Sequence, residues 1–509
     1  MDSLTHGTAG LLLAYALTLI GVLATLLRRR SPTPTLLMSP LVALPALVVG
    51  AIAASILSGV FKSASTALTI PVNAALLVAA GAGGGLWLNR KRQADDVHKR
   101  GAVVEQAPKT QSRASKTGIT LAGISIPPLD EPKHFKFMGT TGAGKSTAIR
   151  EILTGALARG DRALIADPDG GYLTRFYDAA RGDVILNPFD DRTARWDLFG
   201  EIEQSYDVEQ VARSLIADGP DPSGREWRAY ARTFLSAVLE YLKLEGPQDI
   251  EALWRLVTVA DTEELRPLLA GTPAQPFLAE GAGKMFQSIR STASPALAAL
   301  KHLSGGTAPS FGLRRWVREG TGVLFLPYKA GQIAALRDLI ATWMRLAIFE
   351  TLNQSEGDAR LWFVIDELDA LGQIDGLKDA LARLRKFGGR CVLGFQSIAQ
   401  VSGTYGDADA HTIVENCGNT LILRCSTSER GGTAEFASRL IGQREVIRQQ
   451  TSVSTPGRPT GFLHTTRTVG EHLVTENAVM ASEIEQLPDL QGYLKLASVL
   501  EWRRVILLT

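Results

Sequence analysis

Three long uncharged stretches, interrupted only by basic residues, make up most of the first 90 positions. Arg28-Arg29-Arg30 ends the first stretch, Lys62 alone separates the second from the third, and Arg90-Lys91-Arg92 ends the third. About 20 consecutive apolar residues span a bilayer as one helix. The pattern therefore predicts a transmembrane helical region over residues 1–92. The three predicted spans cover about 7–27, 38–61 and 64–88.

The basic clusters also predict how these spans are oriented. Lysine and arginine beside a membrane helix favour the cytoplasmic side, so three spans with an outer N-terminus are expected. Two spans are the alternative if Pro40, Pro45 and Pro71 break one of the stretches. Small residues recur at four-residue spacing, which either allows close helix packing between subunits or reflects their abundance in membrane helices. They are Gly50, Ala54, Ser55, Gly59, Gly81 and Gly85.

The pattern changes after this region. Residues 93–118 are polar, of mixed charge and without apolar periodicity, which is typical of a linker or stalk. From residue 119 on, short apolar runs such as Ala163-Leu164-Ile165-Ala166 and Val184-Ile185-Leu186 alternate with helical periodicity. Alternating strands and helices predict an α/β fold with a parallel-rich sheet.

Residues 197–303 have a helical pattern throughout. Apolar side chains recur there at three- and four-residue spacing on one helical face, and a strand pattern resumes only at Val323-Leu324-Phe325-Leu326. We therefore expect an all-α domain inserted into an α/β domain formed by residues 119–196 and 304–509. The residues on the apolar face include Trp227, Tyr230, Ala231, Phe234, Leu235, Val238, Leu239 and Leu242.

Residues 139–146 match the phosphate-binding pattern G-x-x-x-x-G-K-[ST] in full. A strand-like run precedes them and a helical stretch follows, which is the context that this motif needs. Its glycines let backbone N–H groups surround phosphate oxygens. The Lys145 ammonium reaches the β and γ phosphates, and the Ser146 hydroxyl ligates Mg²⁺. The sequence thus predicts an ATP and Mg²⁺ site. The predicted nucleotide-binding residues are Gly139, Thr140, Thr141, Gly142, Ala143, Gly144, Lys145, Ser146 and Thr147.

A second half of this site is predicted far downstream. The apolar run of residues 361–365 predicts a strand buried on both faces of a parallel sheet, and it ends in Asp366-Glu367. Ligands bind beyond the carboxyl ends of such strands. We expect Asp366 to hold magnesium, directly or through water, and Glu367 to orient and deprotonate the attacking water.

A glutamine ends a third strand-like run, residues 391–395. Gln396 either senses the γ phosphate and positions water, or caps a loop with its amide. The order of phosphate loop, acidic strand and glutamine strand resembles that of RecA-like motor ATPases. The resemblance implies a P-loop NTPase with Lys145, Glu367 and Gln396 in catalytic roles.

Composition adds little to this picture. The formal net charge of +2 does not by itself indicate nucleic-acid binding, and the three cysteines lack metal-ligand spacing. A chain of 509 residues is too long for one compact core, so more than one domain is expected.

The motifs also follow one another in a specific order. The membrane region precedes the phosphate loop. After the loop come, in order, Asn187-Pro188-Phe189-Asp190-Asp191-Arg192, the helical insertion, Asp366-Glu367, a basic segment of residues 385–390, and Gln396-Ser397. This order resembles that of the type IV coupling proteins of bacterial conjugation and secretion, the TraD, TraG and TrwB group. Three spans depart from the usual two-span anchor of that family.

This family resemblance implies a function. It implies a homo-hexameric ATPase on the cytoplasmic face of the bacterial inner membrane that connects a relaxase–DNA complex to a type IV secretion channel. ATP hydrolysis would drive or license the passage of single-stranded DNA, bound without sequence preference. Two alternatives remain: an FtsK-like chromosome translocase, which usually lacks such a helical insertion, and an ATP-binding substrate receptor that acts as a gate. Glu367 and Gln396 argue against the gate, because binding alone needs neither.

Basic residues after the acidic strand are further candidates. They either grip a DNA phosphate backbone or form an ordinary solvated helix face. The cluster consists of Lys378, Arg383, Arg385, Lys386 and Arg390.

Ring motors also need an arginine donated across a subunit boundary to stabilise transition-state charge. Arg424, which ends the strand-like run of residues 420–423, or Arg430 in the next loop is expected to serve. Further on, period-two alternation predicts a hairpin over residues 444–469, with a polar loop at 449–463.

Overall fold

The computed structural model describes residues 2–28, 33–60, 66–90, 97–106, 118–219, 221–303, 310–357, 359–428, 431–454 and 466–508. The chain divides into two compact units. One comprises residues 1–100 with 445–475, and the other residues 101–444 with 476–509.

The apolar N-terminal stretches form helices, as their pattern predicts. Within the described ranges, three helices are long and apolar enough to cross a membrane, over Ala9–Arg28, Ser39–Leu57 and Ile70–Leu88. Pro45 and Pro71 lie inside helices without ending them, which agrees with three spans. The helices are α1 (Asp2–Arg28), α2 (Thr33–Leu37), α3 (Ser39–Val60) and α4 (Thr66–Arg90).

Glycines let α1 and α4 approach each other closely. A Cβ added at Gly81 would lie 2.1 Å from the carbonyl oxygen of Thr18, and one at Gly21 would lie 2.2 Å from that of Val78. Only glycine fits at such a distance, which is the small-residue packing typical of membrane helices. Gly81 of the predicted pattern therefore packs within this chain.

The predicted hairpin is present. Strands β14 (Gln443–Ser454) and β15 (Thr466–Asn477) are neighbours, and β1 (Val97–Gly101) lies on the other side of β14. Arg100 in β1 donates two hydrogen bonds, of 2.8 and 2.7 Å, to the Glu445 carboxylate in β14. The predicted polar loop at 449–463 begins too early, because residues 449–454 belong to β14, and residues 455–463 lie outside the described residues.

The interpretation of residues 93–118 as a linker or stalk is wrong for residues 97–106, which form two strands. β1 belongs to the three-stranded sheet, and β2 (Val104–Gln106) is the edge strand of the large sheet of the second unit. Backbone hydrogen bonds supply the strand pairing at such edges, and the Arg100–Glu445 pair adds to it in β1, so the exposed side chains need no apolar periodicity.

Ten of the described strands form the large sheet, in the order β2-β17-β16-β13-β5-β12-β11-β6-β10-β7. Every neighbouring pair from β13 to β7 is parallel, while β16 is antiparallel to β13 and β17. This confirms the predicted parallel-rich α/β fold. The other strands are β5 (Phe135–Met138), β6 (Arg162–Pro168), β7 (Val184–Ile185), β10 (Val323–Tyr328), β11 (Leu361–Ile365), β12 (Gly389–Phe395), β13 (Asn419–Ile422), β16 (Gln491–Lys495) and β17 (Trp502–Ile506).

The central strands are buried on both faces, because helices cover each face. Alternate side chains enter separate cores: Phe363 of β11 packs with the helices on one face, and Trp362 and Val364 pack with α5 on the other. The helices of this domain are α5 (Lys145–Ala158), α6 (Gly171–Phe176), α12 (Leu313–Glu319), α13 (Ile333–Leu352), α14 (Leu377–Leu384), α15 (Ile398–Tyr405), α16 (Asp407–Glu415), α17 (Gly432–Ile441) and α18 (Ala481–Glu485). A small hairpin, β3 (Thr120–Leu121) with β4 (Ile124–Ser125), precedes them.

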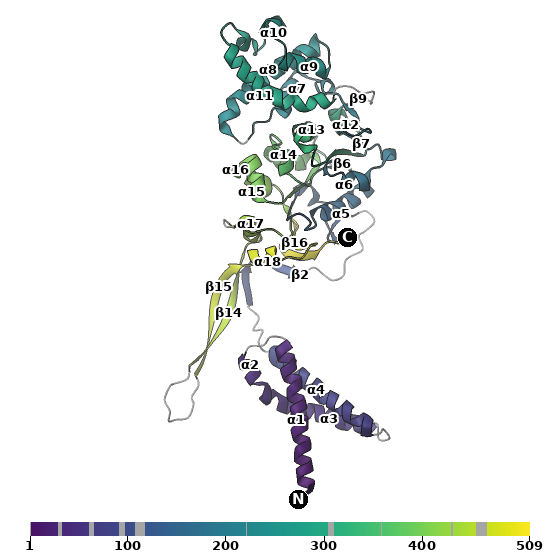
Figure 1. Cartoon of the computed structure of the whole chain (residues 1–509), viewed down its shortest axis with the longest axis vertical. Coiled ribbons are helices and arrows are strands. Elements are labelled where there is room, and N and C mark those ends of the chain that lie inside the picture. The colour runs from purple at the N-terminus through teal and green to yellow at the C-terminus, as the bar shows by residue number, and fades with distance from the viewer. Residues whose placement is uncertain are drawn as a thin grey trace. The chain divides into compact units, whose positions relative to one another are not determined.

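The predicted helical insertion is all-α over its described residues. Its helices gather beyond α13 and α14, at the top of Figure 1. At its base β8 (Arg195–Trp196) pairs in parallel with β9 (Ser310–Phe311), so the chain leaves and re-enters the α/β domain at adjacent points. The helices are α7 (Ser205–Leu215), α8 (Arg225–Leu244), α9 (Ile250–Thr258), α10 (Thr262–Leu268) and α11 (Gly283–Leu297).

Candidate active site

The phosphate loop emerges from the middle of the sheet. β5 lies between β13 and β12, and α5 begins at Lys145, directly after the loop. Gly142 and Gly144 have φ values of +77° and +118°, conformations that glycine adopts readily. A turn of this kind at a helix N-terminus presents backbone N–H groups to phosphate oxygens.

Lys145 is held inside the loop. Its side chain is buried, and Nζ donates a 2.7 Å hydrogen bond to the carbonyl oxygen of Gly139. Burial lowers the pKa of the ammonium from its ordinary value, and the carboxylates of Asp366 and Glu367 oppose that shift. The cation therefore lies ready beside the loop for a phosphate to replace the carbonyl contact.

Ser146 and Asp366, the predicted magnesium ligands, are in direct contact. The Ser146 hydroxyl donates a 2.7 Å hydrogen bond to Oδ2 of Asp366. Oδ1 of Asp366 is buried and has no hydrogen-bond partner among the residues that the structure describes. A hydroxyl and a carboxylate oxygen that lacks a protein donor form the hard oxygen donor set that Mg²⁺ prefers, so these residues fit the ion.

Glu367 and Gln396 are linked to the phosphate loop by hydrogen bonds. The Gln396 amide nitrogen donates a 2.9 Å hydrogen bond to Oε1 of Glu367, and the Gln396 amide oxygen accepts a 3.0 Å hydrogen bond from the Thr141 hydroxyl. This follows from the strand order, because β12 lies between β5 and β11. The amide therefore connects the loop with the predicted base instead of only capping its own turn.

Close backbone packing fixes the acidic strand beside β12. A Cβ added at Gly394 would lie 2.2 Å from the carbonyl oxygen of Asp366. The Leu368 N–H donates a 2.9 Å hydrogen bond to the Gly394 carbonyl. Only glycine allows this approach. The two strands consequently hold Asp366 and Gln396 at one edge of the sheet.

These residues enclose one pocket of about 190 Å³. Leu490, which sequence reasoning missed, covers the loop: it has a φ of +63°, and its N–H donates a 3.0 Å hydrogen bond to the carbonyl of Ala143. The lining residues are Thr141, Gly142, Gly144, Lys145, Ser146, Thr147, Asp366, Glu367, Gln396 and Leu490.

A second residue missed by sequence reasoning is Tyr172, at the start of α6. Its buried hydroxyl donates a 2.8 Å hydrogen bond to Oδ2 of Asp366. Asp167 at the end of β6 accepts the N–H groups of Tyr172 and Leu173, and burial raises the pKa of its carboxyl to about 6. The polar residues that follow the strand-like run 163–166 could have indicated a site at this strand end. The sequence does not show that β6 lies beside β11, which brings Tyr172 to Asp366.

The candidate arginine finger Arg424 lies next to the phosphate loop of its own chain. Its carbonyl accepts the Thr140 N–H at 2.7 Å, and its guanidinium forms a 2.7 Å ion pair with Asp489. Whether it also serves a neighbouring subunit stays a prediction. Arg430, the other candidate, lies outside the described residues.

Two members of the basic cluster serve the fold. Arg390 is 3% exposed and forms a 3.0 Å ion pair with the buried Glu131, and Lys378 forms a 2.7 Å ion pair with Asp409. Their interpretation as DNA contacts is wrong for Arg390, because its charge is buried. The exposed remainder consists of Arg383, Arg385 and Lys386.

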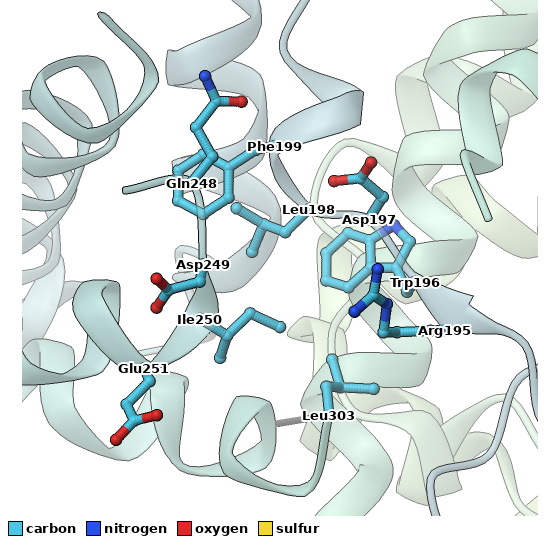
Figure 2. Close-up of a pocket in the computed structure, with 10 residues that line it drawn as sticks. All are labelled: Arg195, Trp196, Asp197, Leu198, Phe199, Gln248, Asp249, Ile250, Glu251 and Leu303. Carbon is cyan, nitrogen blue, oxygen red and sulfur yellow. The ribbon is translucent and has the colours of Figure 1, made fainter. Parts of the chain in front are cut away.

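A larger cavity of about 320 Å³ lies at the base of the helical insertion (Figure 2). Its two aspartates already have structural partners: Asp249 accepts the Ala252 N–H at the start of α9, and Asp197 accepts bonds from Gly200 and Ser310. The nucleotide motifs do not contribute to its lining.

Comparison with known proteins bears on the whole α/β domain with its insertion. Residues 118–508 match the family model described as the type IV secretion-system coupling protein DNA-binding domain. This chain belongs to the type IV coupling protein family. The family predicted from the order of the motifs is thereby confirmed.

Two relatives of this coupling protein illustrate the match. The coupling protein TraD of Escherichia coli (strain K12) is 30% identical over 421 residues, which cover 80% of this chain and 57% of TraD. A conjugal transfer protein TraG of Escherichia coli is 23% identical over 387 residues, which cover 65% of this chain and 58% of TraG. The chain thus spans less than two thirds of the length of these relatives.

Solved structures agree with the fold. The unbound bacterial conjugative coupling protein TrwBdeltaN70 has a TM-score of 0.72 at 32% identity, covering 81% of this chain and 94% of that one. TrwB in complex with ADP and Mg²⁺ has a TM-score of 0.71 at 32% identity, with the same coverage. The RecA-like P-loop domain with an all-α insertion is therefore confirmed.

Proposed function

We propose that this coupling protein is a membrane-anchored ATPase that passes a relaxase-bound single strand of DNA to a type IV secretion channel. The observation that carries the proposal is the arrangement of Ser146 against Asp366 and of Gln396 between Thr141 and Glu367. A protein that binds ATP without hydrolysing it would not need hydrogen bonds that connect the phosphate loop with a carboxylate.

The residues of the pocket would divide the work. Lys145 would exchange its bond to Gly139 for the β and γ phosphates. Ser146 and Asp366 would hold Mg²⁺, which compensates phosphate charge when bound. Glu367 would accept the proton of the attacking water.

Gln396 would report on the nucleotide. Its amide binds both Thr141 and Glu367, and a γ phosphate at the loop would compete for the same amide. We infer that Glu367 becomes free to act as a base when the phosphate takes over that contact.

The assembly we propose is a homo-hexamer in the bacterial inner membrane, with the ATPase domain in the cytoplasm. Support comes from three apolar helices in the described part of the N-terminal region and from the family match. In such a ring, Arg424 or Arg430 would reach the nucleotide of a neighbouring subunit.

A steady-state ATPase assay of the full chain, with and without single-stranded DNA, tests the proposal. Stimulation by DNA is expected for a motor. An ATP-binding gate would bind nucleotide with no turnover, and that result would contradict the proposal. An FtsK-like translocase would also be stimulated, but the family match at residues 118–508 favours coupling.

A further inference from the structure

The carboxylate of the proposed magnesium site is held by a residue outside the nucleotide motifs. Tyr172 is 2% exposed, and its hydroxyl and that of Ser146 both donate to Oδ2 of Asp366, at 2.8 and 2.7 Å. An aspartate carboxylate otherwise rotates broadly about χ2. Two donors on one oxygen therefore fix its rotation and leave Oδ1 as the oxygen without a partner among the described residues.

Tyr172 is fixed in turn by a second carboxylate. Asp167 is fully buried and accepts the Tyr172 N–H at 3.0 Å and the Leu173 N–H at 2.7 Å, which attaches the first turn of α6 to the end of β6. β6 pairs with β11 so that Ala166 lies opposite Ile365. Asp167 and Asp366 thus follow paired residues, and Tyr172 contacts both of them.

The Tyr172 hydroxyl is the donor in its contact with Asp366, because the carboxylate oxygen Oδ2 accepts. The ring also lies 5.8 Å from the guanidinium carbon of Arg150 on α5, which adds a contact with the helix that follows the phosphate loop.

We propose that Tyr172 is a positioning residue for the metal: it holds Oδ2 of Asp366 so that Oδ1 is available to the Mg²⁺ that accompanies the nucleotide. This inference rests on the proposed function, because it assumes that Ser146 and Asp366 hold the ion. Partners that orient a metal ligand typically contribute about 10- to 100-fold to metal affinity or activity. A residue that merely packed α6 against the sheet would change stability without changing the dependence on magnesium.

Tyr172→Phe tests this role, because it removes the hydroxyl and keeps the ring. The full chain in detergent is titrated with Mg²⁺ at a fixed concentration of N-methylanthraniloyl-ADP, whose fluorescence reports binding. Mn²⁺ binding in the presence of ADP, followed by electron paramagnetic resonance, gives a second readout independent of turnover. We expect the Mg²⁺ midpoint to rise about 10-fold, while nucleotide affinity in EDTA changes by about two-fold or less.

Tyr405→Phe is the matched control. Tyr405 is 5% exposed, its hydroxyl accepts a 3.3 Å bond from the Ile374 N–H, and it does not line the nucleotide pocket. This variant should keep the wild-type Mg²⁺ midpoint. A thermal unfolding midpoint near that of wild type checks that each variant is folded.

The outcomes separate the two proposals. An unchanged Mg²⁺ midpoint in Tyr172→Phe overturns the positioning role. Equal weakening with and without Mg²⁺ also overturns it, because the tyrosine would then support the nucleotide site only structurally. Nucleotide binding that is independent of Mg²⁺ in the wild-type protein would instead contradict the proposed ATPase site.

Discussion

Removing the three exposed cations that follow the acidic strand isolates the proposed contact with DNA. Arg383, Arg385 and Lys386 are exposed on and just after α14, where Lys386 makes only a 3.9 Å pair with the exposed Glu356, whereas Lys378 and Arg390 are engaged by carboxylates at 2.7 and 3.0 Å. Each phosphate contact with a single strand contributes about 0.7 to the slope of log affinity against log salt. Alanine at all three positions should therefore reduce the magnitude of the slope by about 2.1. The factor by which DNA affinity falls between about 50 and 200 mM salt should then be roughly 18-fold smaller than in the wild-type protein.

Fluorescence anisotropy of a labelled oligo-dT strand across a salt series measures this slope. Lys378→Ala is the control: it removes one cation of the same helix whose ammonium is bound to Asp409, so its slope should change by less than about 0.7. ATP binding without DNA should persist in the triple variant, because none of its residues lines the nucleotide pocket. An unchanged slope in the triple variant would refute the reasoning and direct the search to another surface.

Three further predictions concern assembly, membrane packing and pH. A chain shortened to begin near Ser115 should be mostly monomeric and the full chain more oligomeric by native mass spectrometry; equal distributions contradict this. Gly81→Leu should lower the thermal unfolding midpoint in detergent, because its Cβ meets the Thr18 carbonyl, whereas Gly83→Leu, where a Cβ meets nothing within 4 Å, should not; equal midpoints would refute the packing argument. Burial lowers the pKa of His134 from 6.5 to about 4, so its contribution to stability is full above pH 6.5 and is lost as the pH falls through 4. His134→Gln should flatten the pH profile of the unfolding midpoint in that window, and an unchanged profile would exclude this histidine as its cause.

Much of the candidate site could be predicted because each of its parts follows a buried apolar run. Such runs become adjacent parallel strands, and the residues after them must reach the same edge of the sheet. Ser146, Asp366, Glu367 and Gln396 are therefore expected at one edge, and hydrogen bonds join Ser146 to Asp366 and Gln396 to Glu367.

What sequence reasoning missed depends on contacts between distant segments. Tyr172 reaches Asp366 only because β6 pairs with β11, and Leu490 covers the phosphate loop through one backbone bond to Ala143. The same limit explains Arg390, whose place in a basic cluster is visible in the sequence while its buried partner Glu131 lies over 250 positions away.

The prediction of a linker or stalk before the α/β domain was wrong for another reason. Strands β1 and β2 are held by backbone pairing at sheet edges, and their side chains are mostly exposed. Side-chain patterns predict burial and not backbone pairing, so the sequence of a strand that is exposed to solvent on both faces resembles that of a linker.

ATP binding and single-turnover hydrolysis, measured on the same full-length samples, test the central claim most directly. Glu367→Gln should retain ATP but lower the hydrolysis rate by about 100-fold or more, since the attacking water loses its base. Lys145→Ala should lose nucleotide binding or turnover, since its cation no longer compensates the phosphates. Wild-type turnover in Glu367→Gln would contradict the account, because the carboxylate beside Gln396 would then have no catalytic role.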